Sequence, residues 1–214
     1  MSRLTRMVLA LAGVVVLIFV LGIAFMPKKQ DLSQYDFLKE PRITAMPDQK
    51  MLVVTIRGDP DIAAKSAFGK LYGAQYRLKR VVSGIQDAAP RARWHGASSG
   101  PQSSWTGVFG LPVPEAADDR ALSSVQADAD VKVDTWTYGE VAEVLHIGSY
   151  DAETPDIDRL HAFIDNAGYE IAGDHEEEYL KGPTVFGRGN PAQYRTIIRY
   201  CVRKTGATGD STTH

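Results

Sequence analysis

The segment GEVAEVLHIGSYDAETPDIDRLHAFIDNAGYEIAGDHEEEYL, residues 139–180, sets the architecture expected for this chain. Within residues 140–147, Val141, Leu145 and Ile147 alternate with Ala142, Val144 and His146, which is typical of a strand buried on both faces or nearly so. The Thr-Pro-Asp tripeptide 154–156 is a helix-start signal, with a hydroxyl at the cap, proline at the first position and an acid in the first turn. Apolar residues then recur at helical spacing until Gly168, and an extended segment follows at 171–180. The segment therefore predicts a strand, a helix and a second strand.

The second strand of this segment carries an acid and a phenol on one side. In an extended chain, Glu177 and Tyr179 point one way, while Glu178 and Leu180 point the other. In an apolar cavity, a carboxylate beside a phenol can hold a cationic or hydrogen-bonding molecule, or deliver a proton to a strained one. The alternative interpretation is a solvated acidic edge strand.

The same order of elements occurs twice along the chain. A further strand is expected at 194–203, after a loop punctuated by Gly and Pro. The preceding elements are expected at residues 51–56 (strand), 61–82 (helix), 92–95 (strand) and 105–113 (strand), followed by an acidic linker at 115–130. Gly69 and Gly73 are expected to let the first helix lie close to the sheet. Strand, helix, strand, strand thus repeats, which predicts an α+β fold of two units with pseudo-twofold symmetry and a central groove.

The N-terminal part predicts a membrane anchor. Residues 7–26 are apolar and uncharged, and a helix of that length can cross a bilayer. An uncleaved anchor is expected rather than a processed leader. The positive charges on its two sides are nearly balanced, and the terminal amine favours a C-terminal domain outside the cytoplasm, as in a single-pass protein of a bacterial inner membrane. The expected organisation is a flank at 1–6, the anchor, a tether at 27–48, a globular domain at 49–204 with halves at about 49–114 and 131–204, and a disordered tail at 205–214.

Composition and motifs exclude several classes of function. The net charge of −2, and the lack of a Lys/Arg stripe with interleaved aromatics, predict no nucleic-acid partner. No His/Cys/Asp spacing indicates a metal site, and no phosphate loop, nucleophile elbow or dinucleotide fingerprint is present, so neither a metal nor a cofactor is expected. His146 is expected to be a core histidine, while His161 and His175 are expected at the surface.

Several stretches resemble the GyrI-like small-molecule-binding domain, the effector-binding domain of multidrug-sensing regulators. They are residues 138–150, the helix with Leu160, the Gly168-Tyr169-Glu170 exit, the Glu177-x-Tyr179-Leu180-x-x-Pro183 strand and, for the opening half, Gly58-Asp59-Pro60 with Phe68, Leu71-Tyr72 and Tyr76-x-Leu78-Lys79. The resemblance implies a duplicated fold with a groove between the halves. It also implies that Glu177 takes the place of the family's ligand-contacting or catalytic carboxylate. Two departures are Lys181-Gly182, where Ser-Asp is common, and Glu178, where an apolar residue is frequent.

Three functions follow from the residues and the resemblance, and a binding role is favoured over an enzymatic one. The first is membrane-tethered binding of a small amphipathic or cationic organic molecule, without a DNA-binding helix-turn-helix. Its expected ligand-binding residues are Glu177, Tyr179, Trp136, Tyr138, Trp105, Phe109 and Tyr72. The second is hydrolysis of strained, cyclopropane-type compounds, with Glu177 activating or orienting water and Tyr179 donating a proton. The third is a protein-interaction module whose acidic strand contacts a basic partner.

Overall fold

The computed structural model describes residues 31–95, 105–183 and 189–206. The expected flank and anchor, the tether up to residue 30 and the tail from residue 207 lie outside the described residues. No helix in the described part of the chain is long and apolar enough to cross a membrane. The chain divides into two compact units, Met1–Gln34 and Tyr35–His214. The first is described only over residues 31–34, which include the start of the 3₁₀ helix η1 (Ser33–Lys39).

The second unit is built on one antiparallel sheet. Its strands are β1 (Arg42–Met46), β2 (Gln49–Arg57), β3 (Arg91–His95), β4 (Thr106–Pro112), β5 (Lys132–Trp136), β6 (Gly139–Ile147), β7 (Tyr169–Ile171), β8 (His175–Lys181) and β9 (Arg195–Lys204). The strand order is β1-β6-β9-β8-β3-β4-β2-β5, with β7 also paired to β9. Its helices are α2 (Pro60–Leu78), α3 (Asp119–Ser124) and α4 (Thr154–Asn166), with the 3₁₀ turns η3 (Tyr150–Ala152) and η4 (Pro191–Gln193).

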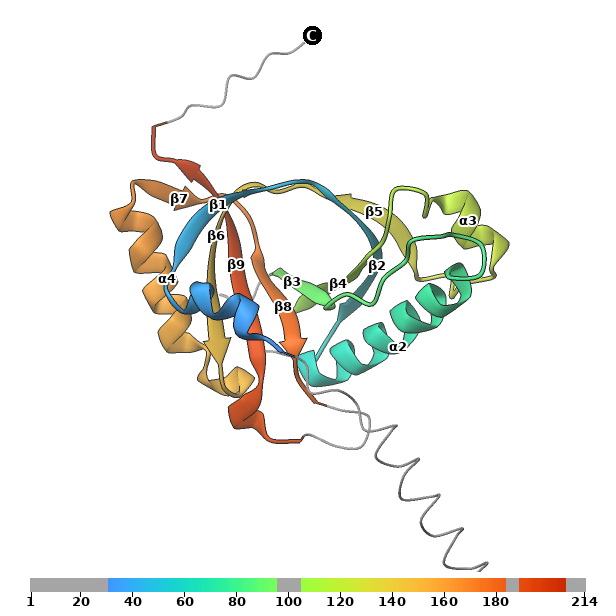
Figure 1. Cartoon of the computed structure of the whole chain (residues 1–214), viewed down its shortest axis with the longest axis horizontal. Coiled ribbons are helices and arrows are strands. Elements are labelled where there is room, and N and C mark those ends of the chain that lie inside the picture. Colours follow the sequence, from blue (N-terminus) through green and yellow to red (C-terminus); the bar gives the residue numbers. More distant parts are fainter. Residues whose placement is uncertain (1–30, 96–104, 184–188, 207–214) are drawn as a thin grey trace, which may run out of the picture. The chain divides into compact units, whose positions relative to one another are not determined.

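The predicted duplication is present in this sheet. The elements β2-α2-β3-β4 form one repeat, and β6-α4-β8-β9 form the other. Within the sheet the repeats have the matching orders β2-β4-β3 and β6-β9-β8, and they meet edge to edge where β3 pairs with β8. Figure 1 shows the two helices on opposite flanks of the curled sheet. The α+β class and the repeated strand-helix-strand-strand order are therefore confirmed.

Several segments differ from the sequence-based expectation. Residues 42–46, expected within the tether, form β1, which pairs with β6 of the second repeat, while β5 pairs with β2 of the first. The segments β1–β2 and β5–β6 therefore each cross from one repeat to the other, and β1–β2 forms a long arch in Figure 1. The strand expected at 171–180 is divided into β7 and β8. The expected linker contains α3, which is capped by the Asp118 side chain accepting from Ala121 N–H.

The helices pack on one face of the sheet. The apolar side of α2 recurs at helical spacing, at Ala63, Ala67, Leu71, Ala74 and Leu78, and all five residues are buried. On α4, Leu160 and Ile164 pack against Val144 and Ile198. Full burial of each Leu side chain stabilises the fold by roughly 1.5–3 kcal/mol. The main contacts of α2 are with β2 and β4, and those of α4 are with β6 and β7, so the central β3–β8 pair lies between the helices.

The expectation for the two glycines of the first helix is wrong. Gly69 and Gly73 are exposed, and a Cβ atom added to either would meet nothing within 4 Å. They lie on the side of α2 that faces away from the sheet, because the buried side is formed by alanine and leucine. Close approach of helix and sheet depends on those alanines instead.

Candidate functional site

The two sides of β8 have different environments. His175, Glu177 and Tyr179 alternate with Glu176 and Glu178, as the sequence predicts for an extended strand. Glu177 lies opposite Ala92 of β3 on one side and Ile198 of β9 on the other. Ala92 and Ile198 belong to the cores under α2 and α4, so Glu177 lies on the helix-covered face. Since β8 is central in the sheet, the interpretation as a solvated edge strand is wrong.

Aromatic rings surround this part of β8. The Tyr179 ring packs at 5.8 Å from Phe68 of α2 and at 5.7 Å from Tyr150 of η3, measured between ring centroids. Trp94 of β3 lies 6.2 Å from Trp105 and 5.3 Å from Phe109. We use the name Glu177 site for the cluster of Trp94, Glu153, His175, Glu177, Tyr179 and Tyr200.

Glu177 is a nearly enclosed carboxylate. Its side chain is 12% exposed, and its Oε1 atom lies 2.8 Å from Nε2 of His175. Burial alone would raise the pKa of Glu177, but the hydrogen bond and charge of His175, with hydrogen bonds from Tyr179 and Trp94, bring it below its ordinary value. Burial and the charge of Glu177 raise the pKa of Tyr179 well above its ordinary value. The site therefore combines an ionised carboxylate with a phenol that keeps its proton.

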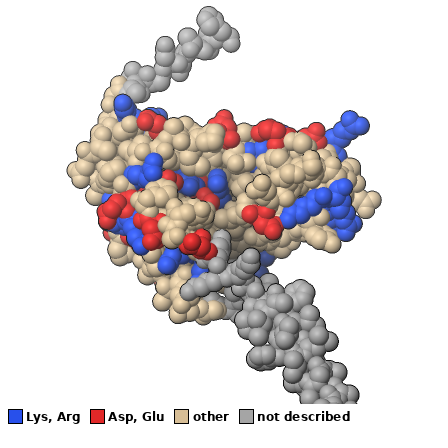
Figure 2. Space-filling view, viewed as in Figure 1, with Lys and Arg blue, Asp and Glu red and all other residues tan. Residues whose placement is uncertain are grey.

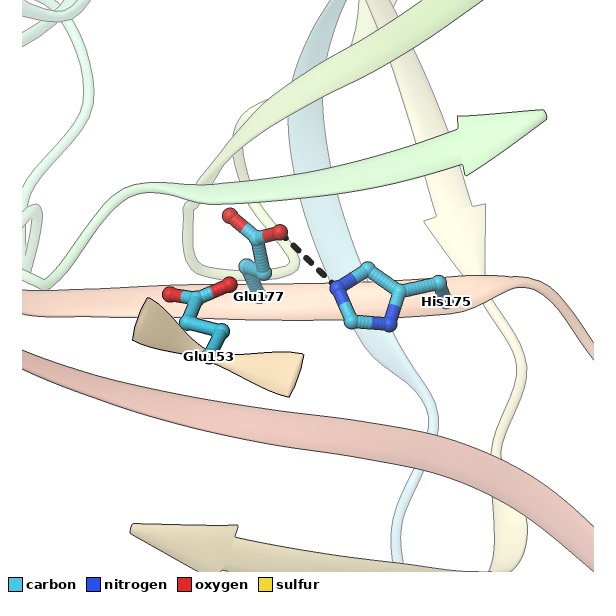
Figure 3. Close-up of side chains that lie close together, drawn as sticks. All are labelled: Glu153, His175 and Glu177. Carbon is cyan, nitrogen blue, oxygen red and sulfur yellow. Dashed lines mark hydrogen bonds and ion pairs between the residues drawn. The ribbon is translucent and has the colours of Figure 1, made fainter. Parts of the chain in front are cut away.

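Glu153 is a second acid in this site, and sequence reasoning missed it. It is 5% exposed and occupies the N-cap of α4, so the expected cap, Thr154, is the first helical residue instead. The Glu153 side chain makes no capping hydrogen bond, and Figure 3 shows it beside Glu177. Its Oε1 atom is buried without a hydrogen-bond partner. Burial, and then the charge of Glu177, raise the pKa of Glu153 to about 9.

His175 is also part of the site and not the surface residue that was expected. Its Nδ1 atom lies 2.7 Å from the hydroxyl oxygen of Tyr200. Burial raises the pKa of Tyr200 to about 12, with a contribution from the charge of Glu177. The two-residue spacing between His175 and Glu177 was the signal that could have placed both on one face. One donor atom from each of Glu153, His175 and Glu177 lies within 4.8 Å of the others, a cluster that the sequence spacing did not indicate.

The remaining predicted site residues separate into two groups. Phe109 is fully buried below the Glu177 site, and Trp105 packs against the same core. Tyr72 is 45% exposed on α2, and its ring lies 6.5 Å from that of Phe68. It therefore lies at the outer edge of the aromatic rings around Tyr179. Trp136 and Tyr138 do not meet Glu177 and instead pack with Met51, Val53 and Val141. Their sheet face is the opposite one, because the residues of β2 and β6 that they contact alternate with those under the helices.

The opposite face holds a buried network of paired charges. Arg199, 4% exposed, bonds to Glu143, Glu176 and Glu178. Burial alone would lower the pKa of Arg199, but these three carboxylates raise it above its ordinary value. Arg93 pairs with Glu176 at 2.8 Å and lies 4.2 Å from the ring centroid of Trp136. These ion pairs explain why Glu176 and Glu178 of β8 are tolerated in the core, because each pair links β8 to a neighbouring strand.

A cavity of about 290 Å³ opens on this second face. Its lining includes Arg93, Tyr138, Glu176 and Cys201, so it is not the groove expected beside Glu177.

His146 is confirmed as a satisfied core histidine, because it is buried and its ring nitrogens lie 2.8 Å from Asp156 Oδ2 and 3.0 Å from the Ser149 carbonyl oxygen. Figure 2 shows basic and acidic side chains interspersed on the visible face.

Solved structures with a similar fold include two from Listeria innocua. One, a hydrolase, has a TM-score of 0.67 and 21% identity, and the match covers 80% of this chain and 97% of that chain. The other, an uncharacterized conserved protein, has a TM-score of 0.69 and 22% identity over the same shares. The EcmrR C-terminal domain matches with a TM-score of 0.56 and 11% identity over 77% of this chain and 98% of that one. The fold is therefore GyrI-like.

Sequence comparison adds no assignment to this fold. No protein-family model matches the chain, and no curated protein matches it. The chemistry of the site must therefore be argued from its own side chains. An ionised carboxylate, a protonated phenol and several ring faces suit an organic cation, and the same pair can also supply base and acid to a bound electrophile.

Proposed function

We propose that this protein binds a small amphipathic or cationic organic molecule at the Glu177 site. The observation that carries the proposal is the ionised Glu177 carboxylate, almost closed off from water and surrounded by aromatic rings. Each well-placed ring contributes about 0.5–2 kcal/mol of cation–π attraction to a ligand cation.

Titration of the full-length protein with tetraphenylphosphonium tests this proposal. The protein is placed in lipid nanodiscs, with empty nanodiscs as the blank, and tryptophan fluorescence is followed because Trp94 and Trp105 lie in or beside the site. Saturable quenching is expected. The neutral analogue triphenylphosphine oxide is expected to bind at least about tenfold more weakly, because it forgoes the charge interaction. Equal affinities for the two compounds would show that the carboxylate does not select the ligand.

Hydrolysis of a strained electrophile is a second candidate function, favoured by the hydrogen bond between Tyr179 and Glu177. Glu177 would take a proton from water while the water oxygen forms a bond to a cyclopropane carbon. The breaking C–C bond would leave its electron pair on the departing carbon, which takes the Tyr179 proton, and the proton on Glu177 would then return to Tyr179. The Listeria hydrolase with the same fold makes this reaction class worth testing.

Mass spectrometry of a cyclopropane-containing alkylating compound incubated with the protein tests this second function. Addition of one water molecule per substrate is expected, and both Glu177→Gln and Tyr179→Phe are expected to slow it at least about a hundredfold, the usual size of an acid or base contribution. Absence of turnover at equimolar protein would leave binding as the function. Retention of turnover in both variants would remove these residues from the chemistry.

The proposal includes tethering of the domain to a membrane by residues 7–26, supported by their uninterrupted apolar character. The full-length chain is expected to stay in the membrane fraction after alkaline carbonate washing, while a variant lacking residues 1–26 is expected in the supernatant. Protease added to intact spheroplasts is expected to cut the C-terminal domain, since the terminal amine favours its export. Carbonate extraction of the full-length chain would argue against an integral anchor.

A further inference from the structure

The geometry points to a divalent metal site formed by Glu153, His175 and Glu177, with zinc as the best-matched ion. One donor atom from each residue lies within 4.8 Å of the other two. Ligand atoms about 2.0–2.1 Å from a tetrahedral zinc are about 3.3 Å apart, so a modest closure of the cluster would complete the contacts. The three residues come from the N-cap of α4 and from alternate positions of β8.

A buried carboxyl oxygen without a hydrogen-bond partner is the independent observation that calls for a ligand here. Glu153 is 5% exposed, and its Oε1 atom has no hydrogen-bond partner. The Glu153 side chain makes no capping hydrogen bond to its own helix either. Figure 3 shows that it turns towards Glu177 instead. Two carboxyl groups placed together in a buried site repel each other when ionised, and a divalent cation between them removes that cost.

The environment of His175 is suited to metal binding. Its Nε2 atom lies 2.8 Å from Glu177 Oε1, so this ring nitrogen already points at a second candidate ligand. In the structure Nε2–H donates to Glu177, and the Tyr200 hydroxyl lies 2.7 Å from Nδ1, where it can accept a hydrogen bond from an Nδ1–H group. A metal ion that displaces the Nε2 proton would therefore gain the Nε2 lone pair as a ligand, with Nδ1–H held by Tyr200. Histidine ligands commonly have their second ring nitrogen fixed in this way. Tyr200 is thus a positioning residue for the proposed ligand.

The ligand set selects among metals. An imidazole nitrogen with two carboxylates suits zinc and its first-row neighbours, whereas calcium requires about six to eight oxygen ligands and magnesium retains an octahedral shell of oxygens. Three protein ligands also leave a coordination position for water or another small ligand, as in zinc sites that are not purely structural. Zinc is a different occupant from the proposed organic ligand and adds Glu153 as a required residue, but both use the Glu177 carboxylate, so zinc and an organic cation are expected to compete for the site.

Calorimetric titration of the EDTA-stripped, full-length protein with zinc chloride tests the inference. One zinc per chain is expected, with magnesium giving no heat under the same conditions. Glu153→Gln and His175→Gln are each expected to weaken zinc binding by at least about tenfold, and Tyr200→Phe by about 10–100-fold, the range for partners of metal ligands. Asp151→Asn and His95→Asn remove an exposed acid and an exposed histidine, and both are expected to leave zinc binding unchanged.

A spectroscopic measurement and a second ligand keep the outcomes separate. Cobalt bound in place of zinc is expected to show visible d–d bands, and these bands are expected to disappear in His175→Gln. A circular dichroism spectrum of the variant that matches wild type would show that the loss does not come from misfolding. Tetraphenylphosphonium titration of the wild-type protein in EDTA measures the proposed function without zinc, so failure of the metal site and failure of the proposed function are distinguishable. Zinc binding that is equal in wild type, Glu153→Gln and His175→Gln, or no binding at 100-fold excess, would overturn the inference.

Discussion

Replacing Glu177 by Gln is expected to weaken tetraphenylphosphonium binding at least about thirtyfold, which corresponds to about 2 kcal/mol or more. Gln preserves the size of the side chain and can still accept a hydrogen bond from His175, but it removes the charge that a bound cation would face. Because the Glu177 side chain is only 12% exposed, water cannot fully replace that charge. Fluorescence titration in nanodiscs, carried out in EDTA, measures the difference.

Asp151→Asn is the matched control for this experiment. It changes the net charge by the same amount, and Asp151 lies in η3, close in sequence to Glu153, but its side chain is exposed. Its affinity for the cation is expected to stay within about twofold of wild type, because an exposed charge is screened by water and salt. If Asp151→Asn and Glu177→Gln weakened binding equally, only the overall charge of the protein would matter, and a specific site would be excluded.

Replacing Arg199 by Met is expected to lower the free energy of unfolding by about 3–5 kcal/mol. Arg199 is 4% exposed and is shared by three carboxylates, of which Glu176 and Glu178 also contact Arg93 and Arg91. Glu143 has no other ion-pair partner among the described residues, so it would be left buried and uncompensated. Guanidinium denaturation of the full-length protein, followed by circular dichroism, measures the change.

Two further variants separate the buried network from a general effect of losing an arginine. Arg203→Met, in the same strand, breaks an exposed pair with Glu170 and is expected to cost less than about 1 kcal/mol. Adding Glu143→Gln to Arg199→Met is expected to recover part of the lost stability, because it removes the uncompensated charge. A denaturation midpoint of Arg199→Met equal to that of Arg203→Met would mean that the network contributes no more than a surface pair.

The sequence predicted the repeated elements and the face shared by Glu177 and Tyr179, because both depend on local periodicity. It did not predict Glu153, whose approach to Glu177 depends on how the start of α4 packs against the sheet. It also placed Trp136 and Tyr138 on the wrong face. The alternation of one short strand cannot say which of its sides lies under a helix, since the pairing of β5 with β2 decides this.

The strand β1 was missed for a related reason. It has only five residues and lies between Pro41 and Pro47, and its burial pattern in the structure is mainly intermediate and exposed. Its partner, β6, is distant along the chain, and only that pairing makes residues 42–46 a strand. A short segment between two prolines whose partner is distant carries little local signal, so the sequence favoured a tether.

Strands β1 and β5 each pair with the other repeat, and this affects how the protein folds during translation. Strand β1 cannot pair until β6 has been synthesised, since Arg42 pairs with Glu143. In the same way, β3 cannot pair with β8 until β8 has been synthesised. During translation the nascent N-terminal repeat therefore exposes two unpaired strand edges until most of the polypeptide has been made. The complete sheet is therefore expected to form only late in synthesis, and not by stepwise pairing of strands that are neighbours in sequence.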